Sequence, residues 1–166
     1  MIGPAAAALL TTAMIAASAA RAGEPDCGHL PSAVTAYLAT HAAWRPVQLS
    51  DLNADDQGLW RQDHAGHCPG VAAADFDGAG RDSYALALLR TGPDGPLEKL
   101  VILHRRPRGS SATTAIAAYK TDSPSVVWRM PPGSAPHDSI VYEQFEAATV
   151  QYYFKGDRLV KIQTSD

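Results

Sequence analysis

From Val71 to the C-terminus, apolar and polar residues alternate with a period of two, and this pattern constrains the fold more than any other feature of the chain. Segments of strand length, rich in β-branched and aromatic residues, are separated by turn-forming residues, which is typical of antiparallel sheets. The turns GPDGP and KGDR are tight, and Gly156-Asp157 fits a two-residue hairpin. We predict strands at SYALALLR (83–90), LEKLVILHR (97–105), TTAIAAYK (113–120), SIVYEQFE (139–146), TVQYYFK (149–155) and RLVKIQT (158–164).

The alternation also assigns residues to the two faces of these strands. Tyr84, Leu86 and Leu88 share one side of their strand, and Val150, Tyr152 and Phe154 share one side of theirs. Side chains on the other side are expected to face solvent or an edge: Gln151, Lys155, Lys161 and Gln163. The connection at 122–138 is too long for a simple turn, so it is either a functional loop or contains a short edge strand at Val126–Arg129.

Before Val71 the apolar residues follow helical spacing instead. We predict a helix from Pro31 to about Ala43, which Pro46 prevents from continuing. A second, short helix would be capped by Ser50 or Asn53. Helices followed by strands predict an α+β fold in which two N-terminal helices are packed on an antiparallel β-meander of about six or seven strands, with the other face open to solvent.

The first 22 residues have the pattern of a secretory signal peptide. They are apolar and Ala-rich and end in Ala20-Arg21-Ala22, a small-x-small sequence that an export peptidase cleaves. No Lys or Arg precedes the apolar run, so a retained anchor and a cytoplasmic start are the alternatives. We predict a signal peptide at 1–22, a single domain at 23–166, a periplasmic or secreted location and no membrane span after cleavage.

Charge and cysteine content restrict the function further. Arg21 is the only charged residue of the leader, so 13 of the 14 Lys and Arg remain against 17 Asp and Glu, a net charge of −4. Such a chain lacks the basic face that a nucleic-acid partner requires. Cys27 and Cys68 are the two cysteines, and in an exported chain they predict one disulfide, worth about 4 kcal/mol. The alternative is a free reactive thiol.

The stretch DFDGAGRDS at 75–83 has features of a metal-binding loop. Calcium prefers six to eight oxygen ligands, which alternating acidic side chains supply when a glycine permits a sharp turn. Asp75 and Asp77 are two residues apart, and Gly80 follows at the turning position. The alternative, which the residues favour, is a hairpin loop whose Asp side chains accept hydrogen bonds from the loop's own amides.

This stretch resembles the calcium loops of FG-GAP and VCBS repeats, whose pattern is D-x-[DN]-x-D-G-x-x-D before a strand. The resemblance covers one copy of some fifteen residues. It implies calcium ligation by Asp75, by Asp77 and by the carbonyl of Arg81, with Asp82 substituting for an acid that the pattern places one residue later. Ala79 and Ser83 stand where two acids belong, so the resemblance implies a weak site. Together with Trp60 and CPG at 68–70, the stretch also resembles small exported bacterial proteins, which implies export and no particular activity.

Three histidines form a second candidate metal site. His64 and His67 are three residues apart beside Cys68, and a disulfide would bring His29 close, which suggests zinc or copper. The alternative is ordinary surface or helix-terminal histidines. We expect no cofactor, and calcium at the Asp75–Asp82 loop is the alternative.

No catalytic constellation is evident in the sequence, because the chain has neither a G-x-S-x-G elbow nor a phosphate-binding lysine loop. The run HRRPRGSS carries Arg105, Arg106 and Arg108 and, together with Trp128, is the best candidate interaction surface; the alternative is a solvated hairpin tip. We predict an exported, non-enzymatic binding protein: a periplasmic or secreted inhibitor, immunity or accessory module with an unidentified protein partner. The alternatives are a weak calcium-binding module and a hydrolase with an unrecognised site.

Overall fold

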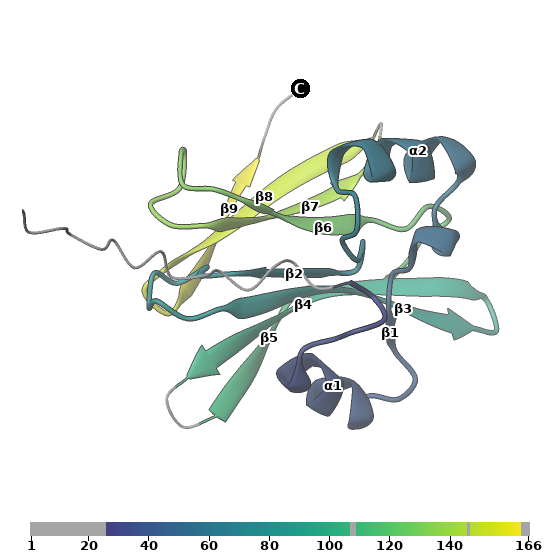
Figure 1. Cartoon of the computed structure of the whole chain (residues 1–166). Helices are drawn as coiled ribbons and strands as arrows, with labels where there is room; N and C mark the ends of the chain where they lie inside the picture. Colours follow the sequence, from purple (N-terminus) through teal and green to yellow (C-terminus); the bar gives the residue numbers. More distant parts are fainter. Residues whose placement is uncertain (1–25, 107–108, 146, 164–166) are drawn as a thin grey trace, which may run out of the picture.

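The computed structural model describes residues 26–106, 109–145 and 147–163; the predicted signal peptide lies outside them. In this part of the chain, two antiparallel sheets are stacked on each other (Figure 1). Sheet A consists of β1 (Arg45–Pro46), β2 (Val71–Ala74), β3 (Ser83–Gly92), β4 (Gly95–Arg106) and β5 (Gly109–Lys120). Sheet B consists of β6 (Val126–Met130), β7 (Ser139–Gln144), β8 (Ala148–Lys155) and β9 (Arg158–Gln163). The helices are α1 (Ser32–Ala39), α2 (Ala54–Asp63) and a 3-10 turn at Leu49–Asp51.

The predicted α+β fold, with two helices on one meander, is wrong. All six predicted strands form, but the meander divides after β5: β6 pairs with β7 and not with β5. One face of sheet A is therefore covered by sheet B. The helix α1 packs on the other face of sheet A, and α2 packs against the core between the sheets. The strand β6 confirms the predicted alternative of a short edge strand within residues 122–138.

The division of the sheet follows from the composition of β3. From Ser83 to Leu89 every residue is buried, so both faces of this strand are covered. A one-layer sheet with helices on one side would leave half of these side chains in water, whereas a second sheet buries them. The predicted solvent-exposed face is thus occupied by sheet B.

The larger core fills the space between the two sheets. Sheet A contributes alternate residues of β3 and β4, among them Leu100 and Ile102, and sheet B contributes Ile140, Tyr152 and Phe154. Val150 packs against the same cluster, as its shared face with Tyr152 and Phe154 predicted, and Trp60 joins it from α2. The main core is thus an inter-sheet core.

A second core lies on the outer face of sheet A, beneath α1. Tyr84, Leu86 and Leu88 meet Val34 of α1 there, which confirms their predicted common face. Cys27 and Cys68 form the predicted disulfide beside this core, with a Cα–Cα distance of 4.7 Å. The N-terminal segment and α1 are thus fixed to the start of β2.

Residues 131–138 cover the outer face of sheet B around Gln151. Gln151, predicted to face solvent, is instead only 2% exposed. Its amide nitrogen donates to Ser139 Oγ at 2.7 Å, and its amide oxygen accepts from Ser134 Oγ at 3.1 Å. These partners satisfy both ends of the amide, so the connection shields this face from solvent.

Both helices begin where the sequence placed them, and α1 is shorter than predicted. Pro31 precedes the first residue of α1, which ends at Ala39 rather than near Ala43. Asn53 caps α2, because its side-chain oxygen accepts from the amide of Asp56 at 2.9 Å. Neither helix of the described chain is long and apolar enough to span a membrane.

Candidate functional site

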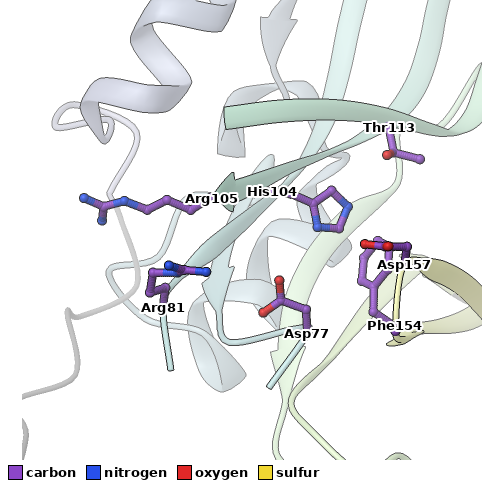
Figure 2. Close-up of a pocket in the computed structure, with 8 residues that line it drawn as sticks. Asp77, Arg81, His104, Arg105, Thr113, Phe154 and Asp157 are labelled. Carbon is purple, nitrogen blue, oxygen red and sulfur yellow. The ribbon is translucent and has the colours of Figure 1, made fainter. Parts of the chain in front are cut away.

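A pocket of about 240 Å³ lies between the β2–β3 loop, strands β4 and β5, and the end of β8 with the turn that follows it (Figure 2). The loop between β2 and β3 contributes Asp77 and Arg81, and the end of β4 contributes His104 and Arg105. The remaining lining residues come from β5, β8 and the β8–β9 turn: Thr113, Phe154, Gly156 and Asp157. The structure thus joins part of the predicted calcium loop to part of the predicted interaction surface.

His104 forms the inner part of this pocket. It continues the face of β4 that carries Leu100 and Ile102, and it is 6% exposed. Its ring meets Phe154 edge to face, with centroids 4.1 Å apart. The sequence analysis missed His104, although its signal was present: a polar residue at the end of an alternating apolar stripe.

The charged side chains around His104 differ in direction. In Figure 2 the Asp77 carboxylate and the Arg81 guanidinium are directed toward the pocket, whereas the Arg105 guanidinium extends away from it. Neither arginine forms an ion pair within the described residues. Arg81 is therefore available inside the pocket and Arg105 at its rim.

The Asp75–Asp82 loop has the hydrogen bonds of the self-bonded hairpin alternative. Asp75 Oδ2 accepts from the Gly80 amide at 2.8 Å, and Asp77 Oδ1 accepts from the Ala79 amide at 3.1 Å. Asp75 Oδ1 is buried and has no hydrogen-bond partner among the described residues. Two oxygens of the predicted calcium set are thus bonded to the loop itself, and a third is buried without a partner in this part of the chain.

Gly78 holds this loop against the rest of the molecule. Its φ is 69°, in the left-handed region, and a Cβ at this position would overlap the His137 ring. Glycine is the residue that meets both requirements. The loop that carries Asp77 and Arg81 is therefore positioned by a contact with the 131–138 connection.

The three histidines of the second predicted metal site serve other contacts. The His64 ring lies between Trp60 and Trp128, with centroid distances of 4.4 and 5.2 Å. His29 has a side chain that is 90% exposed and pairs with Asp26. The carbonyl of His67 accepts from the Trp60 indole at 3.0 Å. Among the described residues, no group of three or more His, Cys, Asp or Glu side chains is arranged to hold a metal ion.

Of the predicted interaction surface, the described side chains of Arg105 and Trp128 have different surroundings. Trp128 is half-buried against the inter-sheet core and His64, and its indole donates to Glu143 at 3.1 Å. Arg105 is exposed at the pocket rim. Arg106 ends β4, and Arg108 lies outside the described residues. Trp128 is thus a packing residue, and Arg105 belongs to the pocket.

A buried polar cluster, also missed from the sequence, joins the two sheets at the opposite end of β4. Glu98 is fully buried, and one carboxylate oxygen accepts from Tyr142 at 2.7 Å and from the Ser125 amide at 3.0 Å. The other oxygen accepts from Tyr119 at 3.3 Å. Burial raises the pKa of Glu98, and the hydrogen bonds from Tyr142 and Ser125 oppose that shift. The cluster connects β4 to β7.

Comparisons with protein-family models, with curated proteins and with solved structures find no match for this chain.

Proposed function

We propose that this chain is an exported binding protein, a periplasmic or secreted inhibitor, immunity or accessory module, and that the His104 pocket receives an acidic side chain of a protein partner. The observation that carries the proposal is the pair Arg81 and Arg105, one guanidinium directed into the pocket and one at its rim, neither with an ion pair among the described residues. Guanidinium groups bind carboxylates through two parallel hydrogen bonds.

The other polar groups of the pocket suit a peptide rather than a simple anion. Asp77 and Asp157 supply acceptors for amide or ammonium donors of a partner, and Thr113 supplies a hydroxyl. A pocket with both charge signs selects a ligand that also carries both donors and acceptors. The disulfide agrees with export.

The experiment is a pull-down from the exported fraction of the producing cells, with residues 23–166 as bait. We expect one stoichiometric partner, whose capture is lost when Arg81→Gln and Arg105→Gln are combined. Lys155→Gln is the matched control, since it removes an exposed cation outside the pocket. Recovery of no partner, or equal capture by the double variant, would reject this function.

A weak calcium-binding module is the second candidate, and the buried, unpartnered Asp75 Oδ1 favours it. A cation at this oxygen would satisfy an atom that otherwise loses its hydration on burial. In this case millimolar calcium raises the melting temperature by several degrees over chelator, and Asp75→Ala abolishes the difference. Equal melting temperatures in calcium and chelator exclude this candidate.

A hydrolase is the third candidate, because His104 shares its pocket with two carboxylates. Histidine and aspartate are the residue types that general acid–base catalysis uses most. If the chain hydrolyses ester or phosphoester substrates from a panel and His104→Ala abolishes this activity, a hydrolase replaces the binding protein as the proposed function. Background rates across the panel leave the binding proposal in place.

A further inference from the structure

A second cationic cluster lies on the outer face of sheet A, at the end nearest the β3–β4 turn. Trp44, just before β1, is its centre. The Arg90 guanidinium carbon lies 5.1 Å from the centroid of the Trp44 ring, and Lys99 Nζ lies 4.2 Å from it. Lys99 also lies 5.9 Å from the ring centroid of Tyr37 in α1. Two positive charges are thus held at one aromatic ring.

These two cations lack an acidic partner. Neither Arg90 nor Lys99 forms an ion pair within the described residues, and the one hydrogen bond of the Lys99 ammonium is a long one of 3.5 Å to the Tyr37 hydroxyl. Arg45 next to them differs, because both of its terminal nitrogens bond Asp51, at 2.6 and 2.7 Å. Arg90 and Lys99 are therefore the uncompensated charges of this surface.

Two features of the surroundings of Lys99 affect its pKa. Burial lowers its pKa, and the positive charge of Arg90 lowers it further. The neighbouring Trp44 ring offsets part of this cost through its negative face. An anion between the two cations would remove their mutual repulsion, and this benefit is larger than at an ordinary exposed lysine.

A hollow of about 320 Å³ gives a ligand access to this cluster. Its lining consists of Ala42, Ala43, Trp44, Arg45, Leu89, Arg90 and Thr91. Lys99 does not line the hollow itself and lies beside it, at the Trp44 ring. The surface therefore combines a hollow and two cations at one aromatic ring.

We propose that Trp44, Arg90 and Lys99 form a binding site for a multiply charged oxyanion, separate from the His104 pocket. The ligand's phosphate or carboxylate groups would contact Arg90 and Lys99 together, and its body would occupy the hollow beside Trp44. The two sites lie toward opposite ends of β4, so each can be removed without altering the other.

The test is calorimetric titration of residues 23–166 with tripolyphosphate and, in a second arm, with citrate, at low ionic strength. We expect saturable binding of at least one anion, weakened about tenfold by Arg90→Gln or by Lys99→Gln, as loss of a charged hydrogen bond predicts. Binding of tripolyphosphate alone identifies a phosphate ligand, and binding of citrate alone identifies a carboxylate ligand. Arg105→Gln, which changes only the His104 pocket, is the control and should leave the affinity unchanged.

A second measurement reports the position of the bound anion. The indole N–H resonance of Trp44, assigned with Trp44→Phe, should shift on titration, while the resonances of Trp60 and Trp128 stay in place. Failure of both anions to bind, wild-type affinity in both Arg90→Gln and Lys99→Gln, or loss of binding in Arg105→Gln would overturn this proposal and leave the peptide-binding proposal untouched.

Discussion

Replacing Glu98 with glutamine should make the stability of this protein less dependent on pH. Glu98 is buried between the sheets, and its pKa is raised above the ordinary value of 4.5, chiefly by burial. The folded state therefore favours the protonated acid more than the unfolded state does. The stability that this preference provides is complete below pH 4.5 and is lost as the pH rises through the folded pKa.

The pH dependence of the unfolding free energy changes by the titration of one group, the Glu98 carboxyl. Between the unfolded and folded pKa values of Glu98, the wild type loses up to about 1.4 kcal/mol of unfolding free energy per pH unit relative to Glu98→Gln. The glutamine oxygen can still accept from Tyr142 and the Ser125 amide, and its NH2 can donate to the Tyr119 hydroxyl once that group rotates. The two proteins should thus differ little at acidic pH.

The assay is urea unfolding of both proteins from pH 4 to pH 8, monitored by tryptophan fluorescence. Glu98→Ala separates charge from hydrogen bonding, since it leaves the buried Ser125 amide and Tyr142 hydroxyl without their acceptor. It should cost about 1–3 kcal/mol for each of these groups. A difference between Glu98→Gln and wild type that stays constant across this range would refute the reasoning.

Three further predictions concern the framework around the sites. Joint replacement of Cys27 and Cys68 by alanine opens a 41-residue separation and should lower the unfolding free energy by about 4 kcal/mol, measured by denaturation beside the reduced wild type. Gly78→Ala should destabilise more than Gly80→Ala, because both have positive φ but only Gly78 faces the His137 ring; equal melting temperatures would contradict the packing argument. Asn53→Ala should cost about 1 kcal/mol by removing the cap of α2, and Asn53→Asp should not restore it, because Asn53 Nδ2 donates to the buried Asp56 Oδ2 at 2.8 Å and a carboxylate there would repel Asp56.

The strands were predictable from the sequence, but the division into two sheets was not. Alternation in segments such as 149–155 determines which residues share a face, and the cores confirm it for Tyr84 and Phe154. Alternation does not say which strand is the neighbour. Residues 121–125 look like an ordinary connection, yet there the chain leaves sheet A and begins sheet B. The local sign in the sequence was the apolar run at 84–89, which contains no charged residue; all of these residues of β3 are buried, which requires a second layer.

The candidate site was predictable only in fragments. Asp77, Arg81 and Arg105 were identified for separate reasons, and only the fold shows that they line one pocket. His104 and Glu98 lie at the two ends of the apolar stripe of β4, positions that alternation marks as inward-facing. A titratable residue at an inward-facing position was the signal for both. The side-chain partners come from distant strands, which no local pattern specifies.

We propose that Arg81 and Arg105 bind an acidic group of a protein partner. The most direct test is to measure the affinity of the captured partner for the wild type and for the Arg81→Gln, Arg105→Gln double variant. We expect the double variant to bind the partner at least about 30-fold more weakly, because loss of interfacial charge pairs costs about 2–5 kcal/mol. The wild-type affinity should also fall as salt is raised, since the exposed Arg105 is screened. Equal affinities at low ionic strength would contradict the account.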